Sequence, residues 1–214
     1  MAEARERLVA AALRLLADGG PDAVQARKVA AEVGASTMAV YTHFGNMGRL
    51  VDAIAAAGFG LLGDRLAAVP RTEDPVADLA ALGLAYRAHA QENPDLYRVM
   101  FGVTAIGGHR PRTADPTAGG DPGGVALRAF THLVDAVAAV VDAGLVRRVD
   151  PAQLAAQLWS ALHGFVLLEI AGFHGDDGVE RVLAPMTVNL LAGAGYDAAA
   201  GGGWPGVSGP PASP

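Results

Sequence analysis

The sequence of 214 residues contains no cysteine, a single lysine and no stretch in which apolar and polar residues alternate as they do in a strand. The absence of cysteine excludes disulfide bridges, thiolate nucleophiles and Cys-ligated metals. The absence of alternating segments argues against a half-buried sheet, and the abundant alanine favours helix. We therefore predict an all-α protein.

Long uncharged segments are also scarce. Residues 151–168, PAQLAAQLWSALHGFVLL, have the length of a marginal membrane span. Four polar side chains lie within the segment and a glutamate follows it: Gln153, Gln157, Ser160, His163 and Glu169. We therefore expect a helix buried between protein surfaces and no membrane partner. The charged start, MAEARERL, is unlike a signal peptide and predicts a cytoplasmic protein.

Charge is distributed unevenly along the chain. Residues 1–50 carry a net charge of +1, whereas the remainder carries −7, which accounts for the total of −6. A protein that binds polyanions through charge alone would have a strongly basic domain. The acidity therefore belongs to the second part of the chain, and the first part is not basic enough for a non-specific polyanion binder.

Apolar residues recur at helical spacing between breaks made by glycine, proline and asparagine. This pattern predicts helices over residues 3–18, 26–33, 36–43, 46–66, 76–92, 94–101, 125–143, 151–172 and 178–193. Residues 102–124 have the composition of a mobile loop. The expected organisation is a helix-turn-helix domain over 1–46, a helical regulatory and dimerisation domain over 47–194, and a disordered tail over 195–214.

The stretch VGASTMAVYTHFGNMGRL, residues 33–50, is rich in glycine and polar side chains within an alanine-rich chain. A helix-turn-helix needs a small residue in its first helix, a residue that tolerates positive φ in the turn, and an apolar residue in its second helix. Ala30, Gly34 and Val40 meet these needs. The second helix would then enter the major groove.

The residues expected to contact DNA lie on and around that second helix. Its exposed positions can reach base edges and phosphates: Thr37, Met38, Tyr41, Thr42 and His43. Ser36 is expected to be its N-cap and is also a candidate contact to DNA, and Phe44 is expected in the core. Asn46 is expected to cap a third helix, whose N–H groups can hold a phosphate.

Residues 24–50 resemble the DNA-binding signature of the tetracycline-repressor (TetR) family, here as VGAS, TMAVYTHF and GNMGRL. The resemblance implies that Tyr41 and His43 contact phosphates and that Thr37, Met38 and Thr42 lie over bases. The chain departs from the family pattern at two positions. Met47 stands where the family usually has lysine, and Gln25 stands where it usually has a threonine cap. Arg27 and Arg49 are the candidates to replace the missing lysine.

In the second half, YRAHAQENPDLYRVMFG and LWSALHGF resemble a subfamily of ligand-binding domains with a Trp…His-Gly element, here Trp159, His163 and Gly164. Trp159 and His163 share one helix face and would give a cavity a polar contact. Candidate cavity residues are Tyr86, Met100, Phe101, Phe130, Trp159 and His163. Ordinary packing in the core is the alternative for each of them.

The sequence contains no metal-ligand spacing and no nucleophile or acid–base set, so we expect neither a cofactor nor an enzyme. Residues 58–63, GFGLLG, match a dinucleotide fingerprint but follow a helical pattern, so close helix packing or a bend is the better explanation. The predicted function is a repressor that leaves its DNA operator when a partly apolar small molecule binds. It would be a homodimer through 151–172 and 178–193. The alternative is a helical carrier with a vestigial DNA-binding head, because the head has little charge and carries Met47.

Overall fold

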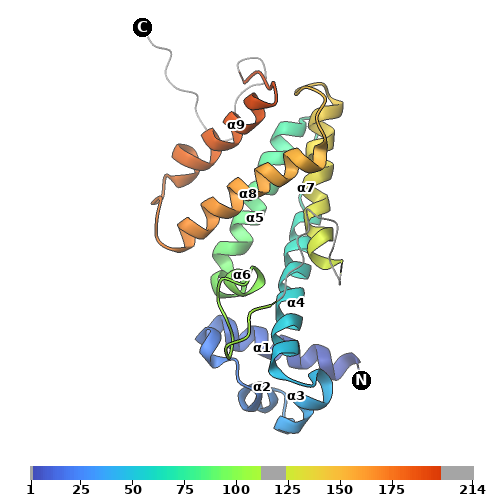
Figure 1. The fold of residues 1–214 in the computed structure, drawn as a ribbon, viewed down its shortest axis with the longest axis vertical. Helices are drawn as coiled ribbons and strands as arrows, with labels where there is room; N and C mark the ends of the chain where they lie inside the picture. The colour runs from blue at the N-terminus through green and yellow to red at the C-terminus, as the bar shows by residue number, and fades with distance from the viewer. Residues whose placement is uncertain (1, 112–123, 199–214) are drawn as a thin grey trace. The chain divides into compact units, whose positions relative to one another are not determined.

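The computed structural model describes residues 2–111 and 124–198. Within these residues the chain is helical and no strand is present, which confirms the predicted class (Figure 1). The α-helices are α1 (Ala2–Gly19), α2 (Ala26–Glu32), α3 (Thr37–Phe44), α4 (Met47–Ala67), α5 (Pro75–Glu92), α6 (Pro94–Met100), α7 (Val125–Asp142), α8 (Pro151–Ile170) and α9 (Ala184–Gly193). A 3₁₀ turn occupies Pro21–Ala23, and a π-helical turn occupies Val179–Leu183.

The observed helices lie close to their predicted positions. The largest departure is at the last predicted helix, which opens as the π-helical turn before α9 begins. Pro185, the second residue of α9, has no N–H to donate to the carbonyl four residues earlier, which is consistent with the irregular start. Beyond residue 198, the predicted tail lies outside the described residues.

The described residues form two compact units, one drawn from the ranges 1–63 and 90–127 and the other from the ranges 64–89 and 128–214. The predicted helix-turn-helix domain lies within the first unit. That unit also includes most of α4 and all of α6. The domain boundaries expected at residues 46 and 194 stay predictions.

In the first unit, α1 packs on α2 and α6 through a stripe of small and large apolar side chains. The buried members of this stripe are Leu8, Ala11, Ala12 and Leu16. Two arginines of α1 add a hydrogen bond and a cation–π contact. Arg7 donates from Nη2 to the carbonyl of Val33 at 3.2 Å, and the Arg5 guanidinium lies 5.0 Å from the centre of the Phe44 ring. These contacts hold α2 and α3 against α1.

The GFGLLG stretch lies in the interior of α4 and has no strand before it, so it does not form a dinucleotide-binding turn. A Cβ atom on Gly58 would lie 2.6 Å from Met100 Sδ and 3.0 Å from Leu96 Cδ1. This glycine therefore lets α6 pack directly on the backbone of α4, as predicted. Gly60 has no such neighbour within 4 Å.

Residues 102–111, here called the strap, are folded although their composition is that of a loop. Ile106 and His109 exchange both backbone hydrogen bonds, at 2.9 and 3.0 Å. Gly107 and Gly108 between them have φ values of 57° and 80°, which a tight two-residue hairpin turn requires. Ile106 is buried. The rest of the predicted loop, residues 112–123, lies outside the described residues.

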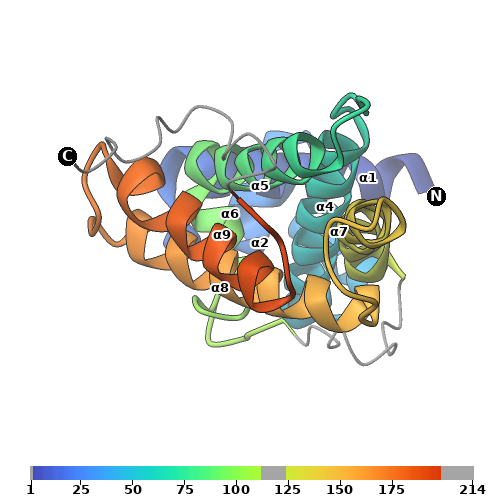
Figure 2. The same cartoon turned by 90° about the horizontal axis from the view of Figure 1, so that it is seen from above.

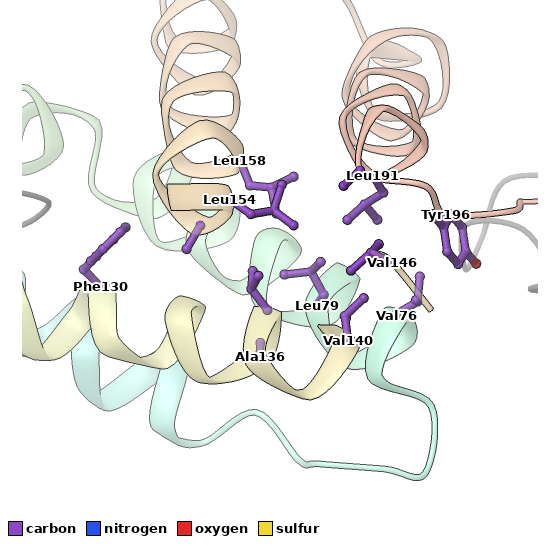
Figure 3. Close-up of a cluster of buried hydrophobic side chains, with 13 residues drawn as sticks. Val76, Leu79, Phe130, Ala136, Val140, Val146, Leu154, Leu158, Leu191 and Tyr196 are labelled. Atoms are coloured by element: carbon purple, nitrogen blue, oxygen red, sulfur yellow. The ribbon is translucent and has the colours of Figure 1, made fainter. Parts of the chain in front are cut away.

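The second unit has its own apolar core, to which α5, α7, α8 and α9 all contribute (Figure 3). Its labelled members include Leu79 of α5, Val140 of α7, Leu154 and Leu158 of α8, and Leu191 of α9. Figures 1 and 2 show α8 and α9 lying side by side. No described helix is long and apolar enough to span a membrane.

Candidate functional site

The turn between α2 and α3 has the geometry that its sequence predicts. Gly34 has a φ of 68°, and the amide of Ala35 donates to the carbonyl of Ala30 at 2.9 Å. Ala30 and Val40 are almost completely buried, where the two helices meet. The pair is therefore a helix-turn-helix, with α3 in the place of the second helix.

The outer face of α3 carries side chains that the protein itself leaves uncovered. Met38 is 69% exposed and Tyr41 is 42% exposed, whereas Val40 and Phe44 are buried on the opposite face. Thr42 is exposed as well, but its hydroxyl donates to the carbonyl of Met38 at 3.0 Å. The Thr42 methyl group and oxygen lone pairs therefore remain for a ligand. Thr37 and His43 are half-buried at the two ends of the helix.

The helix starts around α3 differ in how they are capped. Ser36 has the extended backbone of an N-cap, yet its side chain makes no capping hydrogen bond. Gln25 precedes α2 and also makes none, and its side-chain Nε2 donates to the carbonyl of Asp22 at 3.0 Å. In contrast, Asn46 Oδ1 accepts from the amide of Arg49 at 3.0 Å, which confirms the predicted cap of α4.

Charge near α3 comes from arginine. Arg27 on α2 and Arg49 on α4 are exposed, and Met47, at the position of the family's lysine, is half-buried. Lys28 on α2 is also exposed. The structure therefore presents cations on both helices that flank α3 in sequence.

In the second unit, four of the predicted cavity residues form one cluster. Trp159 Nε1 donates to the Tyr86 hydroxyl at 3.3 Å, and that hydroxyl lies 3.4 Å from His163 Nδ1. The Trp159 and His163 rings stack with centroids 5.5 Å apart, and Phe130 meets Trp159 edge-on. Burial lowers the pKa of His163, because a charged imidazolium would lose its hydration there.

The other two predicted cavity residues lie in the first unit. Met100 is completely buried under Gly58, and the Phe101 ring lies 5.2 Å from that of Phe59 and 4.9 Å from that of Tyr97. For Met100 and Phe101, these contacts support the alternative of ordinary core packing.

A small apolar cavity of about 30 Å³ lies in the second unit. It is lined by Leu79, Gly83 and Leu84 of α5, Leu133 of α7, Leu158 and Leu162 of α8, and Leu183 and Thr187 at the start of the last helix. None of these side chains is ionisable, and the Thr187 hydroxyl donates to the carbonyl of Leu183 at 2.9 Å. On α8, Leu158 and Leu162 immediately precede Trp159 and His163, so the cavity and the aromatic cluster occupy adjacent rows of that helix.

A charged pair also joins α5 to α8 in this unit. Arg87 donates from Nε and Nη2 to the carboxylate of Glu169 at 2.6 to 3.0 Å. The two side chains are 22% and 10% exposed. Among the described residues, no group of three or more histidine, aspartate or glutamate side chains is placed to hold a metal ion.

Comparison with known proteins identifies the family. A model of the bacterial regulatory proteins of the tetR family matches residues 8–54, and a model of the tetracyclin repressor-like C-terminal domain matches residues 79–190. The HTH-type transcriptional regulator Mb1846 of Mycobacterium bovis is 30% identical over 187 residues, which cover 83% of this chain and 74% of that protein. The chain belongs to the tetR family.

Other similar proteins agree with this assignment. The uncharacterized HTH-type transcriptional regulator Rv0681 of Mycobacterium tuberculosis is 28% identical over 88% of this chain and 80% of its own length. A solved structure of a protein with unknown function from Rhodococcus sp. RHA1 has a TM-score of 0.70 and 25% identity, with 89% of this chain and 95% of that one covered.

As a member of the tetR family, the protein is a helix-turn-helix transcriptional regulator, as predicted. The N-terminal match spans every residue predicted to contact DNA, and the C-terminal match spans the aromatic cluster and the leucine-lined cavity. The likeness to the Trp…His-Gly subfamily stays a prediction.

Two of the contacts that were not predicted from the sequence join distant residues of this tetR-family regulator. One is the hydrogen bond between His109 of the strap and Asp52 of α4, and the other is the ion pair of Arg87 with Glu169. The Gly107–Gly108 pair was a usable signal for the first, because two glycines between short segments favour a hairpin turn. The second pair has no local signal, since its partners are 82 residues apart.

Proposed function

We propose that this regulator is a homodimeric repressor that binds its operator through α3 and leaves it when an apolar small molecule enters the second unit. The observation that supports DNA reading is the exposed face of α3, with Met38 and Tyr41 uncovered while Val40 and Phe44 fix the helix from behind. Since a bacterial operator lies on cytoplasmic DNA, the protein acts in the cytoplasm.

The contacts divide into those that read sequence and those that hold the backbone. Thr37, Met38 and Thr42 contact base edges, where the Met38 side chain and the Thr42 methyl suit a thymine methyl group. Tyr41 and His43 contact phosphates.

Further phosphate contacts come from outside α3: Arg27 of α2, the Ser36 hydroxyl and the Asn46-capped start of α4. The role of Ser36 is supported by the absence of a capping hydrogen bond from its side chain, which leaves the hydroxyl to bind a phosphate. The exposed guanidinium groups of Arg27 and Arg49 supply the positive charge that Met47 lacks.

Selection of bound duplexes from random DNA tests this function and supplies the operator. With the selected duplex, Thr37→Ala and Met38→Ala should relax sequence preference at one or two positions, costing about 1–3 kcal/mol there. Tyr41→Phe and His43→Ala should weaken binding to selected and scrambled duplexes by the same factor. Leu61→Ala is the matched control for Met38→Ala, because Leu61 of α4 is a large apolar side chain that is 48% exposed.

Three results would contradict this assignment. If the protein enriches no sequence, or binds with no dependence on salt, it is not an operator-binding protein. Both results together would favour the carrier with a vestigial DNA-binding head. If the Tyr41 and His43 variants alter sequence preference while the Thr37 and Met38 variants do not, α3 is docked with the opposite orientation.

The proposed effector is uncharged and mainly apolar, with one polar group. The leucine-lined cavity offers no ionisable side chain, and the neighbouring Tyr86 hydroxyl and neutral His163 ring can satisfy one hydroxyl or carbonyl. Ligand sites for small molecules usually measure about 300–1,000 Å³. The cavity is far smaller, so the effector must displace leucine side chains and bind the opened conformation more tightly than the closed one. The opened conformation would alter the separation of the two α3 helices in the dimer.

A matched pair of aromatic probes tests the effector class. The neutral 2-naphthol should raise the melting temperature of the protein, whereas the anionic 2-naphthoate should raise it much less because its charge would be buried without a partner. Leu162→Ala should increase the affinity for 2-naphthol, since the space is then already open. Equal shifts from both probes, with no effect of Leu162→Ala, would place the binding elsewhere.

The proposed dimer forms through α8 and α9. Leu168 of α8 is 48% exposed, and a Cβ atom on Gly164 would meet no atom within 4 Å. Gly164→Glu and Leu168→Glu should therefore leave the subunit folded and produce monomers, as measured by light scattering with circular dichroism. Phe165 is unsuited to this test because it is buried against His174. Dimers that persist in both variants would exclude this interface.

A further inference from the structure

The strap contacts the start of α4 through one side chain. His109 Nε2 lies 2.9 Å from Asp52 Oδ1, so an imidazole N–H donates to this carboxylate. The other edge of the same ring lies against the first turn of α4. A Cβ atom on Gly48 would be 2.9 Å from His109 Nδ1 and 3.2 Å from Asn46 Oδ1. His109 therefore lies beside the Asn46 cap of α4.

The strap is built so that His109 is held in place from behind. The hairpin between Ile106 and His109 fixes the backbone, and Ile106 is 1% exposed. Arg110 donates to the carbonyls of Gly102 and Val103, which closes the strap on itself. At its start, the amide of Val103 donates to the carbonyl of Arg98 at 2.8 Å, which ties the strap to α6.

We propose that His109 is a positioning residue for DNA binding. Through Asp52 and against Gly48, it holds the first two turns of α4, and with them the Asn46 cap, in the conformation that binds the operator. No contact between His109 and DNA is required. The proposal rests on the DNA-binding part of the proposed function. It adds His109, 57 positions beyond Asp52, to the residues that set the geometry of the helix-turn-helix and the start of α4.

The proposal is testable because charge and positioning predict opposite changes in DNA affinity when Asp52 is removed. Asp52 is a negative group near a surface that binds a polyanion, so its removal would tighten DNA binding if only charge mattered. If the His109–Asp52 hydrogen bond positions α4, its removal must weaken DNA binding. Asp52→Asn separates the two effects, since the asparagine Oδ1 atom still accepts from the imidazole N–H.

The first experiment measures affinity for the selected duplex by fluorescence anisotropy. Asp52→Ala and His109→Ala should each weaken binding by roughly three- to tenfold, the effect of one hydrogen bond. The double variant should be no weaker than either single variant, because both remove the same contact. Asp52→Asn should bind at least as tightly as the wild type, because it keeps the acceptor for the imidazole N–H and removes a negative charge. Asp64→Ala is the matched control, since Asp64 is an exposed acid on the same helix.

The second experiment uses two glycines of α4. Alanine favours a helix interior by up to about 1 kcal/mol over glycine. At Gly60, where a Cβ atom meets nothing within 4 Å, alanine should stabilise the protein and leave DNA affinity unchanged. At Gly48, alanine would press on the His109 ring, so DNA affinity should fall as it does in His109→Ala. Unfolding curves for both variants show whether the fold is retained.

Each outcome is decisive. Tighter or unchanged DNA binding by Asp52→Ala, additive effects in the double variant, or a Gly48→Ala protein that behaves like Gly60→Ala would overturn the positioning role. If the wild type selects no duplex, the proposed function itself fails. If the wild type selects a duplex and the His109 variants bind it equally well, only this inference fails.

Discussion

Replacement of Gly34 by valine tests the turn on which the DNA-binding head depends. Gly34 has a φ of 68°, and a Cβ atom built on it meets nothing within 4 Å. The cost of a side chain there therefore comes from the backbone conformation and not from a clash. A left-handed backbone costs an L-residue about 1–2 kcal/mol, and more when the residue is β-branched.

Part of that cost is offset in the unfolded state. Loss of glycine restricts the unfolded chain and returns about 0.4–1 kcal/mol. We therefore expect Gly34→Val to lower the free energy of unfolding by roughly 1–2 kcal/mol, Gly34→Ala by less, and Gly34→Asn least, because asparagine tolerates this region. Operator affinity should fall in the same order, since a valine that escapes the strain must shift α3 relative to α2.

The assay pairs urea unfolding with titration of the selected duplex for the three variants and the wild type. Loss of DNA affinity by Gly34→Val with an unchanged unfolding curve would refute the argument, because it would show that no strain was introduced. An asparagine variant as damaged as the valine variant would also refute it, since the effect would then depend on space and not on φ.

Three further predictions concern the packing of each unit. Gly58→Ala should be less stable than Gly60→Ala by roughly 1–3 kcal/mol in urea unfolding, because only Gly58 faces α6 side chains within 3 Å; equal stabilities would show that α6 gives way freely. Burial lowers the pKa of His163, so the unfolded chain binds the proton more readily, and stability should fall as pH drops below the ordinary histidine value of about 6.5. His163→Gln should lose this part of the pH dependence. The same pH profile of stability in the variant and the wild type would exclude the effect. Arg87→Ala should destabilise the protein, because it leaves the Glu169 carboxylate largely buried without its partner. The double variant Arg87→Ala/Glu169→Leu should recover stability, because it removes the unpaired charge. No recovery in thermal melts would mean that the ion pair itself stabilises the fold.

The helices and the turn of the head were predictable because their causes lie within a few residues. Gly34 needed only its own backbone freedom, and the spacing of Ala30 and Val40 is a local pattern. The Asn46 cap of α4 also forms within three residues of chain. The residues predicted for the face of α3 follow from the same local periodicity, since Val40 and Phe44 mark its buried side.

The remaining features depend on which distant segments meet, and no local pattern specifies that. Tyr86 and His163 are 77 residues apart, and His109 and Asp52 are 57 apart. Met100 was predicted as a cavity residue from its apolar side chain. In the structure it packs against the backbone of Gly58 in the first unit. The volume of the leucine-lined cavity is set by how four helical segments pack side chains against one another, and periodicity predicts only that each segment has an apolar face.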